Sequence, residues 1–138
     1  MIILQDIPPN FLDIVRVFPG AKKRKGVVFA WGDRLYNPDG IDVPPALRAH
    51  EETHQLRQVA FDGGPQRWWD RYLADSAFCY AEELVAHQVE FKEFCAHHTK
   101  GRSQFLSFIA RRLSGPLYGH PVTFDKAKHL IRWGTPER

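Results

Sequence analysis

Residues 43–60 read VPPALRAHEETHQLRQVA and predict the central helix of the fold. Two prolines stand at the start of this stretch, where the first helical turn tolerates them, and neither Gly nor Pro interrupts the run from Ala46 to Ala60. We therefore expect a helix from about residue 45 to residue 60. It contains the pattern H-E-x-x-H at residues 50–54.

The H-E-x-x-H pattern predicts half of a metal site. His50 and His54 are four residues apart, so on a helix they project from one face and can bind a single cation through neutral imidazoles. Glu51 is rotated by about 100° from His50, beside the metal, where it can take a proton from a metal-bound water. Glu52 points away and is expected to be a solvated charge. The alternative is a pair of surface histidines without a metal.

A second helix offers a carboxylate ligand. Residues 82–90 read EELVAHQVE, and Glu83, His87 and Glu90 form one polar stripe. An adjacent apolar face contains Tyr80, Leu84, Phe91 and Cys95. Burying an unpaired carboxylate is costly, and a zinc ion would compensate by turning it into a ligand. The small Ala86 would allow the two helices to approach closely, whereas a stripe facing water is the alternative.

Glu83, and not its neighbour Glu82, is the expected third ligand. The two side chains diverge by about 100° on a helix, so both cannot face the histidine pair. Glu82 aligns with Cys79 and Glu93, and we expect it nearer the solvent.

Two further groups of residues are weaker candidates. Tyr118 and His120 stand in the Gly/Pro-rich segment 114–121, where either could donate a hydrogen bond to an oxyanion, although a turn-forming Tyr-Gly pair explains the pattern equally well. Cys95, His97 and His98 lack the ligand spacing of a second metal site, which favours a helix end.

The rest of the chain predicts one α+β domain spanning residues 1–138. Strands are expected at 11–18, 26–31 and 34–36, forming a small N-terminal sheet. A short amphipathic piece around residues 68–73 should precede a long helix, capped by Asp75 or Ser76 and ending near His98. Further helices are expected near 103–113 and 125–133.

Composition favours an ordinary soluble protein. The chain has 138 residues, 43% of them hydrophobic, and a formal net charge of +3. The basic run Lys22–Lys25 is interpreted as a solvated turn between two strands, so no nucleic-acid partner is expected. No export signal or apolar run of about 20 residues is visible, which predicts a cytoplasmic protein without a membrane partner. Cys79 and Cys95 are too far apart on one helix to pair, and the aromatic residues are expected to pack the core.

The motifs resemble the gluzincin group of zinc peptidases, in which the HExxH helix is followed by a helix supplying a glutamate ligand, sometimes within E-x-x-A-D. Here the corresponding segment is Glu83 to His87. Residues 40–132 look more closely like small phage-encoded metallopeptidases, on the runs 43–54, 68–73 and 114–119. The resemblance implies a minimal zincin-like domain that binds Zn²⁺, with His50, His54 and Glu83 as ligands, and a phage or prophage gene product.

Peptide or amide hydrolysis with Glu51 as general base is the expected activity. The expected substrates are proteins or peptides, with phage structural proteins and cell-wall peptides as alternatives. His87 stands where the resembled signature often has Asp or Tyr, which leaves open an outer-shell role, a transition-state donor or a spare ligand. The rival class is a virion structural or assembly protein that keeps the zinc fold without turnover. Glu51 argues against that class, because a purely structural site needs no general base.

Overall fold

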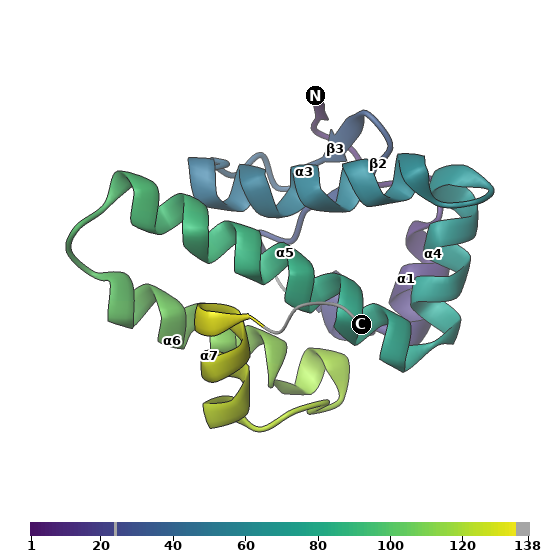
Figure 1. The fold of residues 1–138 in the computed structure, drawn as a ribbon. Helices are drawn as coiled ribbons and strands as arrows, with labels where there is room; N and C mark the ends of the chain where they lie inside the picture. Colours follow the sequence, from purple (N-terminus) through teal and green to yellow (C-terminus); the bar gives the residue numbers. More distant parts are fainter. Residues whose placement is uncertain (24, 135–138) are drawn as a thin grey trace.

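Two long antiparallel helices form the centre of the protein. The computed structural model describes residues 1–23 and 25–134, and in it α3 (Pro45–Ala60) lies along α5 (Ser76–His97) (Figure 1). His50 near the start of α3 contacts Glu90 near the end of α5, and Arg57 near the end of α3 contacts Glu82 near the start of α5. The two helices therefore run in opposite directions, which brings the polar faces of both helices together.

Helix α4 (Gly64–Ala74) connects the two long helices and closes one end of the pair. The side chain of Asp75 accepts hydrogen bonds from the backbone N–H of Ala77 at 3.0 Å and of Phe78 at 3.1 Å, which confirms the predicted cap of α5. Trp68, Trp69 and Tyr72 of α4 are buried, with relative exposures between 1% and 6%. The amphipathic piece expected from the sequence is thus a helix whose aromatic face packs into the core.

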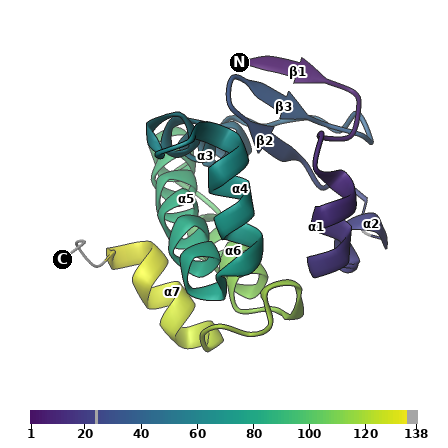
Figure 2. The same cartoon turned by 90° about the vertical axis from the view of Figure 1, so that its right-hand side faces the viewer.

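A three-stranded sheet lies beside the helices (Figure 2). Its strands are β1 (Ile2–Leu4), β2 (Phe29–Trp31) and β3 (Arg34–Tyr36), in the order β1-β3-β2, with β1 parallel and β2 antiparallel to β3. Gln58 of α3 connects the helices to β2 and to the residue that follows it. Its Nε2 donates to Ala30 O at 2.9 Å, and its Oε1 accepts from Gly32 N at 2.7 Å. The sheet is therefore held in place by a side chain one helical turn beyond His54.

The prediction of a strand at 11–18 is wrong, because this segment forms α1 (Phe11–Val17), followed by the short α2 (Gly20–Lys23). Phe11, Ile14 and Phe18 are spaced by three and four residues, so on a helix they share one face, and that face packs against the core. The basic run begins inside α2, so the prediction of a turn between two strands is wrong. Its Arg24 lies outside the described residues.

Two strand boundaries also differ from the expectation. Strand β2 begins at Phe29 and not at residue 26, and β1 was not predicted. The three residues of β1 are too few to show an alternating pattern, and they are extended because they pair with β3, about 30 residues further along the chain.

The C-terminal helices cover the other flank of α5. Helices α6 (Arg102–Leu113) and α7 (Phe124–Trp133) pack on α5 and on each other, and each begins one residue before its predicted start. Tyr80, Leu84 and Phe91 of α5 pack against their core, as their predicted apolar face requires. A short 3₁₀ turn, η1 (Pro116–Tyr118), links α6 to the last helix.

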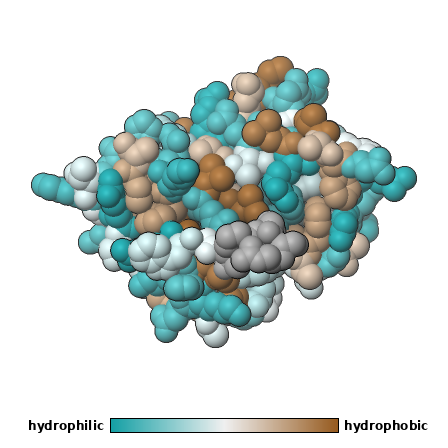
Figure 3. All heavy atoms as spheres, viewed as in Figure 1, coloured by the Kyte–Doolittle hydropathy of each residue, from teal (hydrophilic) through white to brown (hydrophobic). Residues whose placement is uncertain are grey.

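The remaining features of the fold concern its surface and its two cysteines. Polar residues dominate the outline in Figure 3, with apolar residues gathered toward the middle of this face. Most aromatic residues pack inside as expected, whereas Trp133 and Phe108 are exposed. Cys79 and Cys95 are free thiols. None of the helices formed by the described residues is long and apolar enough to cross a membrane.

Candidate metal centre

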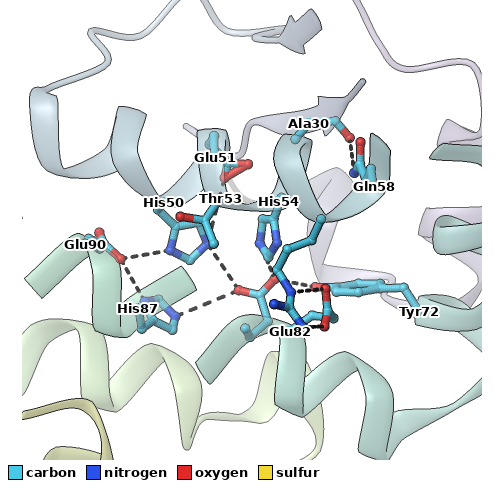
Figure 4. A network of polar contacts seen from close by, with 12 residues as sticks. Ala30, His50, Glu51, Thr53, His54, Gln58, Tyr72, Glu82, His87 and Glu90 are labelled. Carbon is cyan, nitrogen blue, oxygen red and sulfur yellow. Dashed lines mark hydrogen bonds and ion pairs between the residues drawn. The ribbon is translucent and has the colours of Figure 1, made fainter. Parts of the chain in front are cut away.

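The two histidines of the H-E-x-x-H pattern point from α3 toward α5 (Figure 4). Both contact Glu83 of α5. His50 Nε2 lies 3.3 Å from Glu83 Oε1, and His54 Nε2 lies 2.8 Å from Glu83 Oε2. All three residues are buried, with exposures of 6%, 5% and 4%. Two ligands of a tetrahedral zinc, each about 2.0–2.1 Å from the ion, are ~3.3 Å apart. Both contacts of Glu83 with the histidines are therefore close to the separation between two ligands of one zinc ion.

Glu90 fixes the orientation of two imidazole rings. Its Oε1 lies 2.9 Å from His50 Nδ1 and 2.8 Å from His87 Nδ1. An ionised carboxylate only accepts hydrogen bonds, so each Nδ1 carries the hydrogen and each Nε2 is left to face the site. Burial raises the pKa of Glu90, but the hydrogen bonds from His50 and His87 outweigh it and lower the pKa to about 2. Carboxylates of this kind commonly orient the histidine ligands of metal sites.

The metal-free protein should lose stability in acid partly through Glu90. A carboxyl whose pKa is lower in the folded state than in the unfolded state stabilises the fold fully at a pH above its unfolded-state pKa. For Glu90 this contribution is lost as the pH falls from 4.5 toward about 2. Glu90→Gln removes the titrating group. Thermal melts of the metal-free protein between about pH 6 and pH 3 should therefore decline less steeply for Glu90→Gln than for the wild type. Parallel declines would contradict the assignment.

The surroundings of His50 favour its protonated form in the metal-free site. Burial lowers its pKa, but hydrogen bonds with Glu83 and Glu90 and the negative charges of Glu83 and Glu51 raise the pKa well above 6.5. A cation bound at His50 Nε2 would take the place of the proton that faces Glu83. Metal binding should therefore release a proton from His50.

His87 lies beside the three predicted ligands. Its Nε2 is 3.9 Å from Glu83 Oε1, and its ring centroid is 4.5 Å from that of His50. Burial and the neighbouring charge of His50 lower the pKa of His87, so the ring is neutral. Within residues 1–23 and 25–134, neither this buried Nε2 nor the buried Nδ1 of His54 has a hydrogen-bond partner.

Glu51 is placed next to the ligands without being one of the closest contacts. Its Oε2 lies 3.8 Å from His50 Nε2, beyond hydrogen-bond distance, and the residue lines the cavity above the histidines. Burial raises the pKa of Glu51, and the charges of His50 and His54 only partly offset this. The neighbouring Glu52 is half exposed and lies 3.7 Å from Arg48, in agreement with its expected surface position.

Two tyrosines approach Glu83 from different elements. The hydroxyl of Tyr72 in α4 donates to Glu83 Oε2 at 2.8 Å, a contact that the sequence analysis missed. Tyr118 lines the same cavity, and burial together with the charge of Glu83 raises its pKa well above 10. Burial likewise raises the pKa of Tyr72, so both hydroxyls are protonated and able to donate.

His120, the other candidate from the same loop, is exposed, and its Nδ1 lies 2.9 Å from Ser114 O. It is not one of the described residues that line the cavity.

The cavity is lined by both polar and apolar residues. Its volume is about 110 Å³, and its polar lining includes the histidines, Glu51 and Glu83. Its apolar lining includes Ile14, Phe18, Val27, Val28, Phe29 and Leu117. A small apolar group can therefore fit next to the candidate ligands.

The prediction that Glu82 lies near the solvent is wrong. Glu82 is 4% exposed, and its two oxygens accept hydrogen bonds of 2.8 Å each from the guanidinium of Arg57. Trp68 Nε1 also donates to Glu82 Oε1 at 2.8 Å. Arg57 near the end of α3 and Trp68 of α4 cover the side of α5 that carries Glu82, so Glu82 connects three helices. It does not face the histidine pair.

The C-terminal end of α5 uses its histidines differently. His97 Nε2 lies 2.7 Å from Glu93 Oε2, and the ring of His98 stacks on Phe94 at 4.2 Å between centroids. Among the residues that the structure describes, the sets of three His or Glu ligand atoms that lie within 4.8 Å of one another are His50 with His87 and Glu90, and His50 with Glu51 and His54. Glu83 belongs to neither set and meets His50 and His54 through different oxygens.

The donor set fits a divalent transition metal such as zinc. Two imidazole Nε2 atoms and a carboxylate converge in a buried site, and the orphaned Nε2 of His87 supplies a further lone pair. No family model, curated protein or solved structure matches this chain. The metal hypothesis therefore depends on the motif and on this geometry.

Proposed function

We propose that the protein is a zinc-dependent hydrolase of peptide or amide bonds, with His50, His54 and Glu83 as the metal ligands of a minimal zincin-like site. The observation that carries the proposal is the convergence of both Nε2 atoms on Glu83, with the carboxylate of Glu51 beside them in a cavity. A purely structural site has no use for such a carboxylate.

The chemistry divides between the ion and the side chains. When bound, zinc supplies a water of lowered pKa, near 7, and polarises a substrate carbonyl. Glu51 accepts the proton of the attacking water and returns it to the leaving amine. Its raised pKa suits it to hold a proton between these two transfers.

The tyrosines have supporting roles in this proposal. Tyr72 holds one oxygen of Glu83 by a hydrogen bond, which leaves the other oxygen facing His50. Tyr118 lines the cavity as a neutral phenol and would donate to the oxyanion that forms from the substrate carbonyl.

Metal removal and restoration test the proposal. Protein as purified is expected to contain about one zinc per chain by elemental analysis, and its hydrolysis of a peptide, protein and cell-wall peptide panel should stop with a chelator and return with zinc. The melting temperature should fall on chelation, because a ligand present at about 100 times its Kd stabilises the folded state by ~2.7 kcal/mol. Turnover that persists in the fully metal-free protein would contradict the proposal.

A zinc-binding structural or assembly protein is the second candidate. The observation in its favour is the bare Nε2 of His87, which can occupy the position that a hydrolase leaves for water. The resemblance to phage-encoded proteins suggests a virion as the place for such a role. Full zinc content without turnover on any substrate of the panel would favour this candidate.

A further inference from the structure

We propose that His87 binds the metal through Nε2 as a fourth protein ligand, beside His50, His54 and Glu83. The inference rests on the metal site of the proposed function but not on hydrolysis. It concerns how many protein atoms the ion contacts, which can be measured whether or not the protein turns over a substrate.

The position of His87 is the first argument. Its Nε2 lies 3.9 Å from Glu83 Oε1, and the same oxygen lies 3.3 Å from His50 Nε2. The ring centroids of His50 and His87 are 4.5 Å apart, comparable to the 4.8 Å between His50 and His54. Three imidazoles therefore lie around the carboxylate of Glu83. The distance of 3.9 Å between His87 Nε2 and Glu83 Oε1 is only slightly longer than the ~3.3 Å between two ligands of a tetrahedral zinc.

The hydrogen-bond pattern is the second argument. His87 Nδ1 donates to Glu90, so the neutral ring presents a lone pair at Nε2. A ring in this state accepts a hydrogen bond or binds a metal, and it cannot donate to an oxyanion from Nε2. His50 is oriented by the same oxygen of Glu90. One carboxylate thus prepares both rings in the same way, as carboxylates behind metal-binding histidines commonly do.

Burial and charge are the third argument. His87 is 4% exposed, and its Nε2 is without a hydrogen-bond partner in the part of the chain that the structure describes. An unsatisfied buried polar atom destabilises the folded state, and a metal bond would remove that cost. The carboxylates of Glu83 and Glu90 also supply negative charge near the ion.

A fourth protein ligand has a consequence for the resting site. A tetrahedral ion with three imidazoles and one carboxylate has no open position. Hydrolysis would then need a fifth coordination position or the release of His87 when the substrate binds. With His87 bound, the resting metal site is closed by a side chain of the protein. With His87 released, the site is open to water or substrate.

Counting the bound imidazoles tests the proposal on the unaltered protein. In zinc-loaded wild-type protein, X-ray absorption should show three imidazoles per ion, and the ¹⁵N signal of His87 Nε2 should shift on zinc addition. Two imidazoles and an unchanged His87 signal would overturn the inference while leaving the zinc site intact. Failure to bind zinc at all would overturn the proposed function together with it.

Variants provide a second, independent measurement. His87→Ala should weaken zinc binding by roughly 100-fold in a chelator competition and alter the visible spectrum of the cobalt(II) protein. His97→Ala is the matched control, because His97 lies on the same helix but is exposed and contacts Glu93. It should behave as wild type.

A third variant separates folding from ligation. Glu90→Gln keeps the shape of the side chain and leaves His87 in place but removes the carboxylate that orients it, so zinc binding should weaken here too, by about 10-fold or more. Wild-type zinc affinity in a folded His87→Ala variant would refute the assignment of His87. If that variant does not fold, the imidazole count in the wild type decides.

Discussion

Glu51→Gln is expected to retain about one zinc per chain and to lose hydrolysis by roughly 10²–10⁴-fold. The substitution keeps the size of the side chain, but an amide cannot take a proton from the attacking water. Glu51 Oε2 lies 3.8 Å from His50 Nε2, and Glu51 lines the cavity, where a carboxylate can act as a base beside the metal. The measurement is kcat on a susceptible peptide, together with elemental analysis and a thermal melt.

Glu52→Gln is the matched control for this prediction. Glu52 is the next residue on α3, but its side chain is half exposed and lies near Arg48, outside the cavity. Its replacement should leave both zinc content and turnover at the wild-type level. Loss of zinc in Glu51→Gln would instead make Glu51 a ligand, which is geometrically possible because it can be grouped with His50 and His54.

The α-helical part of the fold could be predicted because its signals are local. Prolines at the start of α3, the Asp75 cap of α5 and the glycines between helices each act within a few residues. The N-terminal region was harder. The apolar residues of α1 include the β-branched Val15 and Val17, which favour a strand by propensity, while the packing of Phe11, Ile14 and Phe18 favours the helix.

Only those parts of the candidate site whose sequence pattern lies within a single helix could be predicted. The shared face of His50 and His54 follows from helical geometry. The same geometry allows only one of Glu82 and Glu83 to face them, and the polar stripe with His87 and Glu90 and the resembled spacing favoured Glu83, which contacts both histidines. Tyr72 comes from a third helix, and nothing in its local sequence shows that it reaches Glu83.

Helical geometry also leaves the surroundings of each face undetermined. Glu90 was on the predicted polar stripe, but its contact with two imidazoles depends on the antiparallel register of α3 and α5. Glu82 was misplaced for the same reason. The angle between the side chains of Glu82 and Glu83 follows from the helix alone. The burial of Glu82 depends on Arg57 of α3 and Trp68 of α4, which contact it only in the folded protein.

Glu83→Ala is expected to weaken zinc binding by orders of magnitude. Glu83 is the carboxylate that contacts both His50 Nε2 and His54 Nε2, and without it the two imidazoles lack the anionic ligand that offsets the charge of the ion. The substitution also removes the acceptor of the Tyr72 hydroxyl, so some stability should be lost as well. A chelator competition on folded protein measures the affinity separately from the melting temperature.

Glu82→Gln distinguishes loss of a ligand from loss of a buried carboxylate. Glu82 is as buried as Glu83 and is held by Arg57 and Trp68, but it points away from the histidines. The amide oxygen can still accept from Trp68, so Glu82→Gln should lower the melting temperature through its weakened contact with Arg57 while zinc affinity stays near the wild-type level. The opposite result, with zinc lost in Glu82→Gln and kept in Glu83→Ala, would require α5 to be rotated by one residue. That rotation would also take His87 away from the ion, so the two variants together test the face of α5 on which both proposals depend.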